Sequence, residues 1–175
     1  MTDPWLVLVD LQRIFGAPDS PWAAPRFDAA AAACARLAER FAPRVVLTRF
    51  VAPERPTGAW GPYYEQFPFA LVPADDPLYD LVDPFAGNGF EVVTRTTFGK
   101  WGPELAALTG GAPLVVGGVS TDCCVLSTVL PAADDGVGVT VVADACAGAS
   151  DADHARALDA MRLYAPLLEV VDSLP

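Results

Sequence analysis

Short apolar runs that alternate with helix-like segments limit the fold of this 175-residue chain more than any other feature. The runs are rich in Val and Leu, as expected of strands that are buried on both faces. They cover residues 5–10, 44–50, 91–94, 114–117, 138–143 and 167–171, and the helix-like segments cover 26–41, 102–108, 122–134 and 151–164. This order predicts a doubly wound, parallel six-stranded sheet with helices on both faces, a Rossmann-like three-layer α/β/α arrangement in one domain over residues 1–175.

Composition and charge limit the partners that the chain is expected to have. Apolar residues make up 53% and charged residues 19%, which is typical of a folded globular domain. The formal charge of −11 argues against nucleic acid or an anionic membrane as a partner. We expect neither a transmembrane helix nor a signal peptide, because no long apolar run and no basic leader stand in the sequence. Four cysteines without framework spacing predict thiols in a reducing cytoplasm.

Polar side chains stand directly after several of the strand-like runs. Asp10 ends the first run, Arg95 follows the third, and the turn 120–124 follows the fourth. The carboxyl ends of parallel strands share one edge of a sheet, and ligands bind there near the switch in strand order. We therefore expect these residues to meet at one ligand site.

The stretch from Leu114 to Leu130 carries the strongest chemical signal. Gly117 and Gly118 are expected to end its strand, and the two cysteines that follow are expected to begin a helix. A cysteine at a helix N-terminus faces unpaired backbone N–H groups and the positive end of the helix dipole, which lower the pKa of its thiol. The same N–H groups suit a developing oxyanion. The turn thus predicts a low-pKa nucleophile and an oxyanion hole together.

Residues 118–128, GVSTDCCVLST, resemble the nucleophile turn of the isochorismatase-like cysteine hydrolases, the family of nicotinamidases and N-carbamoylsarcosine amidases. The recurring form there is G-V-x-T-[DE]-x-C-V followed by a helix. The resemblance implies that Cys124 is the nucleophile and that a cis peptide joins Val119 to Ser120. It also implies an oxyanion hole made of the backbone N–H groups of Ser120 and Cys124.

The other cysteines receive a structural interpretation. Cys123 occupies the variable position of the pattern, and we expect it, like Cys34 and Cys146, to act as a small hydrophobic residue. A strained vicinal disulfide between Cys123 and Cys124 is an alternative. A thiol redox protein that uses this pair is a further alternative, although the C-x-x-C spacing is missing.

Asp10 is the second catalytic candidate. The segment LVLVDLQ resembles the family's opening strand, in which an Asp followed by x-Q serves as the general base. A carboxylate at the mouth of an apolar strand is partly desolvated, which raises its pKa and suits proton transfer. The alternatives are a loop cap or a structural ion pair with an arginine. Gln12 either orients Asp10 or caps the turn.

The third catalytic position departs from the family pattern. The family has a lysine after the third strand, in a form close to V-V-x-K-x-x-F-S-x-F, and this chain has Arg95 there. Arginine supplies a fixed charge that could hold a thiolate and a carboxylate, but it does not shuttle protons. Lys100, the chain's single lysine, is the other candidate for the role. The alternatives are a plain ion pair for Arg95 and a solvated surface position for Lys100.

We expect no metal and no cofactor. Nicotinamidases of the family carry D-x-H after the second strand and bind a divalent metal, whereas this chain has Thr48-Arg49-Phe50 there. Its single histidine, His154, is expected in the first turn of the last helix, so a zinc ligand set is missing. A glycine-rich dinucleotide fingerprint is also absent from the sequence.

The long segment 51–90 holds many of the prolines and aromatic residues and is expected to be a loop with a short helix or two. Together with the strand ends it offers side chains for a substrate pocket, although each could equally be ordinary core: Gln12, Phe15, Arg49, Trp60, Tyr63, Tyr64 and Trp101. The resemblance also implies a homo-oligomer.

These observations predict a cysteine-dependent hydrolase that cleaves a small amide or related C–N bond through a covalent acyl-enzyme. The catalytic candidates are Cys124, Asp10, Arg95 and Lys100. The rival hypothesis is a non-catalytic protein that binds small molecules on the same scaffold, and the arginine at position 95 favours it.

Overall fold

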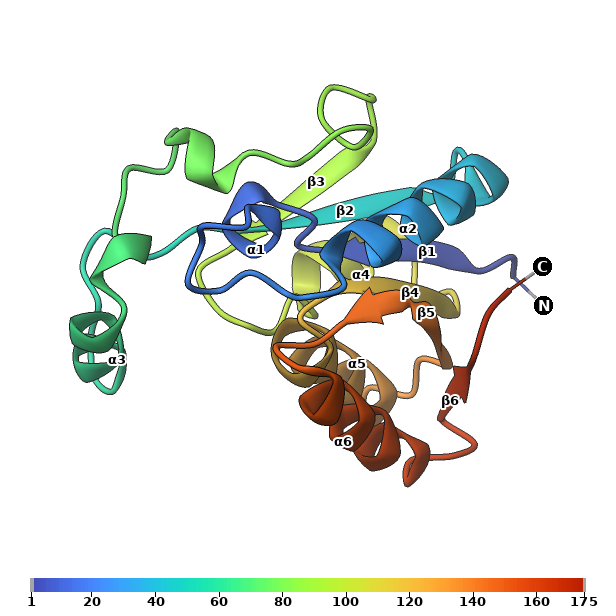
Figure 1. The fold of residues 1–175 in the computed structure, drawn as a ribbon. Helices are drawn as coiled ribbons and strands as arrows, with labels where there is room; N and C mark the ends of the chain where they lie inside the picture. The colour runs from blue at the N-terminus through green and yellow to red at the C-terminus, as the bar shows by residue number, and fades with distance from the viewer. Residues whose placement is uncertain (1, 175) are drawn as a thin grey trace.

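Six parallel strands form one sheet in the computed structural model, which describes residues 2–174 (Figure 1). The strand order is β3-β2-β1-β4-β5-β6, so the order reverses between β1 and β4. The strands are β1 (Trp5–Val9), β2 (Val45–Phe50), β3 (Glu91–Arg95), β4 (Leu114–Val119), β5 (Val139–Ala147) and β6 (Leu168–Val171). The predicted fold class is confirmed.

Helices cover both faces of the sheet, as Figure 1 shows for α2 on one face and α5 and α6 on the other. The α-helices are α1 (Arg13–Gly16), α2 (Phe27–Phe41), α3 (Trp60–Gln66), α4 (Pro103–Thr109), α5 (Leu126–Asp134) and α6 (Asp151–Arg162). Three short helices of other types are η1 (Pro68–Ala70), η2 (Pro77–Tyr79) and the π-helical turn η3 (Thr121–Val125). No helix of residues 2–174 has both the length and the apolar run needed to cross a membrane.

The apolar runs of the central strands arise because their side chains meet a helical layer on each face of the sheet. In β1, Leu6 and Leu8 pack into the core beneath α2, whereas Val7 and Val9 pack into the core beneath α5 and α6. All four side chains are buried, so alternation of apolar and polar residues is absent from the strand.

Strand β4 continues past the point where its glycines were expected to end it. Gly117 and Gly118 remain in the strand, which pairs Val9 of β1 with Gly118. A Cβ atom on Gly118 would lie 2.1 Å from the carbonyl oxygen of Val9, and its φ of 121° also requires glycine. The glycine therefore marks a close approach of two strands at the switch in strand order, beside Asp10.

The remaining differences lie in short segments. The single turn α1 was not predicted, because four residues carry no readable helical period. The segment 51–90 contains α3, η1 and η2, in line with the expected loop and short helices. His154 lies in the first turn of α6, which begins after a Ser150 side chain that accepts a hydrogen bond from the N–H of Asp153.

Candidate active site

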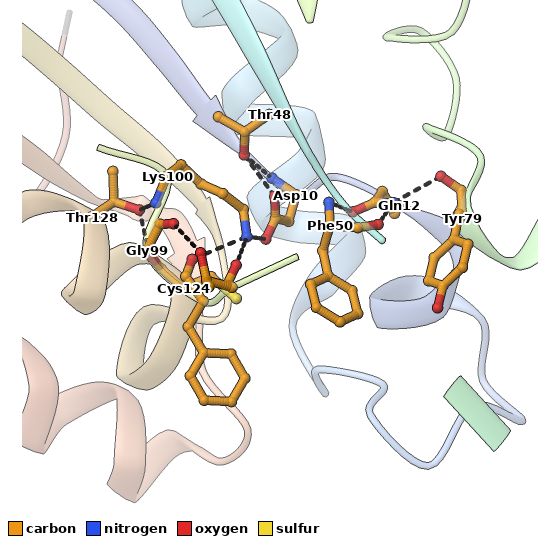
Figure 2. A network of polar contacts seen from close by, with 11 residues as sticks. Asp10, Gln12, Thr48, Phe50, Tyr79, Gly99, Lys100, Cys124 and Thr128 are labelled. Carbon is orange, nitrogen blue, oxygen red and sulfur yellow. Dashed lines mark hydrogen bonds and ion pairs between the residues drawn. The ribbon is translucent and has the colours of Figure 1, made fainter. Parts of the chain in front are cut away.

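Asp10 and Lys100 form a fully buried ion pair at the carboxyl edge of the sheet. The Lys100 Nζ lies 2.9 Å from the Asp10 Oδ2, and both side chains have 0% exposure. Figure 2 shows the ammonium pointing at the carboxylate, with the side chain of Cys124 beside them. Burying two charges is costly, so the pair persists only where further polar groups complete its coordination.

The backbone before Lys100 supplies those further groups. Its Nζ donates to the carbonyl oxygens of Thr97 at 2.6 Å and Phe98 at 3.0 Å, so the chain folds back over its own ammonium. The ammonium also lies 5.5 Å from the centre of the Phe50 ring, a cation–π distance. Thr128 of α5 accepts from the Lys100 N–H at 2.9 Å and donates to the Cys124 carbonyl at 2.6 Å (Figure 2). Thr128 thereby ties the lysine loop to the cysteine turn.

Asp10 is held in an unusual backbone conformation directly after β1. Its φ of 51° lies in the left-handed region that few non-glycine residues adopt. The Thr48 hydroxyl donates to Oδ1 at 2.6 Å, and the same hydroxyl oxygen accepts from the Asp10 N–H at 3.2 Å. No hydrogen bond of normal geometry from residues 2–174 reaches Oδ2, which makes only the ion-pair contact. The two carboxylate oxygens therefore have different partners, the Thr48 hydroxyl for Oδ1 and the Lys100 ammonium for Oδ2.

Cys124 lies inside η3, immediately after β4, with 3% of its surface exposed. The peptide bond between Val119 and Ser120 is cis. The Ser120 carbonyl accepts hydrogen bonds from the N–H groups of Cys123 at 3.1 Å and Val125 at 3.0 Å. It does not accept one from the N–H of Cys124, which lies between them in the sequence. The π-helical turn thus keeps the Cys124 N–H off the first acceptor of the helix, as π-bulges at functional sites often do.

The pKa of Cys124 is raised well above its ordinary value, so the predicted low pKa is wrong. Burial is the main cause, and the Asp10 carboxylate adds to it through its charge and a side-chain hydrogen bond, while the Lys100 ammonium opposes the shift. Helix-terminus arguments neglect the desolvation of a thiol that is almost fully buried. The raised pKa favours the thiol form of Cys124 at neutral pH.

Arg95 does not hold Asp10, which corrects the prediction that it might replace the family's lysine there. Its guanidinium Nη2 lies 3.9 Å from the Glu104 Oε2 at the start of α4, and about a third of its side chain is exposed. Lys100 makes the contact with Asp10 instead. The reason is the fold of residues 96–100, which leave the end of β3 and return the lysine to the edge of β1.

A cavity of about 180 Å³ opens above Cys124. Ser120, Cys123 and Cys124 line its base, and Asp122 and Ala149 line one side. The rest of its lining consists of Pro21, Ala23 and five aromatic side chains: Phe15, Trp22, Phe50, Tyr63 and Phe98. Burial and the nearby cysteines raise the pKa of Tyr63 to about 12, which keeps its hydroxyl protonated at neutral pH.

Of the predicted substrate-binding residues, Phe15 and Tyr63 line this cavity and the others do not. Gln12 is buried and cross-links the chain: its amide donates to the carbonyls of Phe50 and Tyr79 at 2.8 Å each and accepts from the Phe50 N–H at 2.7 Å. Gln12 therefore fastens the turn after β1 and does not contact Asp10 through its side chain. Arg49 donates to the carbonyls of Tyr79 and Ala74, away from the cavity.

The three remaining aromatic predictions occupy supporting positions. Trp60 packs against Tyr63 and Phe98, with ring centres 5.4 Å and 5.2 Å away, behind the cavity wall. Tyr64 is buried in the core, and Trp101 donates from its indole to Asp135. Sequence reasoning missed Trp22, Phe50 and Phe98 as wall residues, although the position of Phe50 at the end of β2 is a signal that could have identified it.

The last three residues of β2 do not fit a metal centre. Thr48 is bound to Asp10, Arg49 points to backbone carbonyls, and Phe50 faces the cavity with its ring. Within residues 2–174 no group of three or more His, Cys, Asp or Glu side chains gathers as metal ligands would.

Several solved structures share this fold. A cysteine hydrolase from Pseudomonas syringae aligns with a TM-score of 0.81 and 18% identity over 95% of this chain and 87% of that one. A nicotinamidase/pyrazinamidase from Bacillus subtilis aligns at 0.78 and 17% over 98% and 100%. The pyrazinamidase of Pyrococcus horikoshii in complex with zinc aligns at 0.77 and 22% over 97% and 99%. At these identities the likeness concerns the fold alone.

Sequence comparison adds the family. Isochorismatase domain-containing protein 2 of Xenopus laevis is 33% identical over 102 residues, which are 56% of this chain and 46% of that protein. The chain thus matches about half the length of this curated relative. The family model described as "Isochorismatase domain" matches residues 4–173, nearly the whole chain. Together with the strand order and the cysteine turn, this match shows that the chain belongs to the isochorismatase family of hydrolases.

Proposed function

We propose that this hydrolase cleaves a small amide or related C–N bond through a covalent intermediate on Cys124. The observation that carries the proposal is the buried Asp10–Lys100 pair beside the cysteine, at the base of a cavity of about 180 Å³. A cavity of this size suits a small metabolite better than a peptide or a drug-sized ligand. The names of the nicotinamidase and pyrazinamidase neighbours agree with amide hydrolysis.

The raised pKa of Cys124 assigns Asp10 the role of general base. As the Cys124 Sγ bonds to the substrate carbonyl carbon, its proton passes to the Asp10 carboxylate. When the C–N bond breaks, Asp10 returns that proton to the departing nitrogen, which leaves as ammonia or an amine. Asp10 then takes a proton from the water that attacks the thioester and returns it to the Cys124 sulfur as the C–S bond breaks. The carboxylic acid product loses its own proton to solvent, so the free thiol and the Asp10 carboxylate are restored.

The remaining groups of the site are proposed to stabilise the negative charge that develops during the reaction. The backbone N–H groups of Ser120 and Cys124 are proposed to bind the oxygen of the tetrahedral intermediate, because the turn leaves the Cys124 N–H off the Ser120 carbonyl. Lys100 balances the charge of the buried Asp10 carboxylate and offsets the negative charge that the reaction develops. The catalytic triad of the proposal is therefore Cys124, Asp10 and Lys100.

Two rival hypotheses have less support than the proposed hydrolase. The non-catalytic binding protein rested on an arginine at the lysine position, and Lys100 now occupies the contact with Asp10. The thiol redox protein lacks the C-x-x-C spacing, and Cys124 is buried beside the Asp10–Lys100 pair.

Intact mass spectrometry tests the proposal directly. The wild-type protein, Cys124→Ala and Cys123→Ala are incubated with a panel of small primary amides, including nicotinamide and pyrazinamide, and ammonia release is followed in parallel. We expect an acyl adduct and ammonia with the wild-type protein and Cys123→Ala, and neither with Cys124→Ala. Hydrolysis that persists in Cys124→Ala would overturn the covalent mechanism.

We further propose a cytoplasmic homo-oligomer. The four free cysteines support a reducing compartment. An apolar patch at the end of α6 supports self-association, because Leu163, Tyr164 and Leu167 are 84%, 39% and 48% exposed. Light scattering on the wild-type protein and Leu163→Glu would measure the assembly, and a monomeric wild-type protein would contradict it.

A further inference from the structure

The cavity above Cys124 combines an aromatic wall with a single carboxylate. Its twelve lining residues include five aromatic side chains and Asp122, and none of these described lining residues is a lysine, arginine or histidine. Amide hydrolysis by itself requires neither the aromatic surface nor the acid. The aromatic wall and Asp122 are therefore expected to bind the part of the substrate that does not react.

The aromatic wall is continuous and centred on Trp22. Its ring lies 6.1 Å from Phe15 and 6.1 Å from Tyr63, and Tyr63 lies 5.8 Å from Phe98. These rings come from four separate segments: helix α1, the loop before α2, helix α3 and the loop after β3. Aromatic faces attract a cation within about 6 Å of the ring centre, and Trp and Tyr do so best.

Asp122 is fixed at the side of this wall. Its Oδ1 accepts from the Ala149 N–H at 2.9 Å. A Cβ atom on Gly148 would lie 2.8 Å from the same oxygen. The absence of a side chain at Gly148 therefore provides the space that the carboxylate occupies. The acid is thus seated by the backbone of the 148–149 loop, and no described cation is paired with it.

The nearby basic groups do not offset the charge of Asp122. The Lys100 ammonium is paired with Asp10, and the exposed Arg26 is paired with Asp151. His154 contacts Thr121 through its Nδ1, and burial is the main cause that lowers its pKa, which favours the neutral ring at pH 7. The whole chain carries a formal charge of −11, which attracts cations and repels anions during encounter.

We propose that the substrate is a small amide whose acyl part carries a quaternary or protonated ammonium group, held by Trp22, Tyr63 and Asp122 while its carbonyl meets Cys124. The assignment rests on the proposed amide hydrolysis and adds the substrate's charge to it. A carboxylate in place of the ammonium would face Asp122 without a cationic partner, so anionic amides are excluded. The hydrolysis itself is unchanged: ammonia leaves, and the product is an ammonium carboxylate.

Three amides of matched shape test the charge. They are trimethylammonioacetamide, its neutral isostere 3,3-dimethylbutanamide and the anion malonamate, each with one methylene between the variable group and the amide. We expect kcat/KM for the cation to exceed that for the neutral amide by at least about tenfold, from the cation–π and charge contacts together. Malonamate should be turned over more slowly than both. Equal or faster hydrolysis of the neutral amide would overturn the inference.

Two variants test whether the charge of Asp122 causes the preference for the cationic amide. Asp122→Asn keeps an Oδ1 for the Ala149 N–H but removes the charge, and it should lower the cation-to-neutral ratio at least fivefold. Asp159→Asn is the control, because it removes an exposed carboxylate on α6 that is paired with Arg162. It should leave the ratio unchanged. A ratio that survives Asp122→Asn would also overturn the inference.

Binding to Cys124→Ala separates this inference from the proposed function. Calorimetry with trimethylammonioacetamide and with 3,3-dimethylbutanamide measures selectivity without turnover. Selective binding of the cation without hydrolysis by the wild-type protein would uphold the pocket assignment and overturn the proposed function. Cysteine-dependent hydrolysis with a preference for the neutral amide would uphold the proposed function and overturn the pocket assignment. Absence of binding by both amides, with other amides hydrolysed, would overturn the pocket assignment.

Discussion

Arg95, the last residue of β3, and Lys100, in the loop that follows, occupy opposite environments. Lys100 has 0% side-chain exposure and lies 2.9 Å from a buried carboxylate, whereas Arg95 is 32% exposed and lies 3.9 Å from Glu104, which is 54% exposed. Arg95 stands where the family pattern places its lysine, yet Lys100 reaches the site. The comparison shows that the position of a charge in space, set by the loop 96–100, decides its role.

The two ion pairs are also expected to differ in how much the loss of one partner lowers the stability of the protein. A partly exposed ion pair contributes about 0–1 kcal/mol, because water screens it and the side chains lose freedom. Breaking a buried pair by removing one partner costs about 3–5 kcal/mol, because the other charge stays buried without compensation. The two residues should therefore differ strongly in their response to mutation.

The largest effect is expected for Lys100→Met. It leaves the Asp10 carboxylate buried without its cation, so the free energy of unfolding should fall by about 3–5 kcal/mol in urea titrations. Hydrolysis of any substrate found should fall by about 10²–10³-fold or more, as when one charge-stabilising group is removed from an active site. Wild-type stability in Lys100→Met would show that the pair is not formed.

A double variant serves as the control for this prediction. Asp10→Asn combined with Lys100→Met removes both charges, and part of the lost stability should return because no charge then remains buried alone. Activity should not return, because the general base is missing. Strictly additive losses of stability would contradict a direct interaction between the two side chains.

The pH dependence of Cys124 alkylation should separate Asp10 from Lys100. The thiolate is the reactive form, and a raised pKa means that the rate rises only at a pH above that of an ordinary cysteine, about 8.5. Asp10→Asn removes a carboxylate that raises this pKa, so the rate curve should move to lower pH. Lys100→Met removes a cation that lowers it, so the curve should move to higher pH. Iodoacetamide labelling followed by intact mass in a Cys123→Ala background measures both shifts.

A smaller effect is expected for Thr128→Val, which probes how Lys100 is held in place. The variant keeps the shape of the side chain but removes the acceptor of the buried Lys100 N–H and the donor to the Cys124 carbonyl. Stability should fall by about 1–3 kcal/mol, the cost of a buried donor without a partner. Thr128→Ser, which keeps the hydroxyl, should restore most of it. Equal stabilities of the two variants would contradict this role.

The sequence predicted the elements that local pattern determines. The apolar runs identified all six strands, and the carboxyl-edge rule brought Asp10 and Cys124 to one place, because both follow strands that are neighbours in the sheet. The rule did not separate Arg95 from Lys100, because the path of the loop depends on carbonyls of Thr97 and Phe98 that close around the ammonium. No residue pattern encodes such a backbone path.

The ionisation of Cys124 and the wall of the cavity were harder to predict for a related reason. The helix N-terminus argument considered local dipoles, whereas the burial that raises the pKa comes from the surrounding core. Trp22 and Phe98 reach the cavity only because α3 packs against both loops through Tyr63. Gln12 was expected to orient Asp10 or cap the turn, and its long-range contacts with Phe50 and Tyr79 depend on chain segments 38 and 67 residues away.

The smallest effect is expected for Arg95→Ala, and it tests the comparison from the other side. Removing a cation that is partly exposed and paired at 3.9 Å should change the free energy of unfolding by less than about 1 kcal/mol. Asp10 and Lys100 contribute to the pKa of Cys124, and Arg95 is not among the contributing groups, so the alkylation curve should stay where it is in the wild-type protein. Glu104→Gln is the matched control, because it breaks the same pair from its acidic side and should have the same small effect. If Arg95→Ala shifts the alkylation curve while Glu104→Gln does not, the guanidinium acts on the cysteine in solution, and the catalytic cation must be sought at both positions.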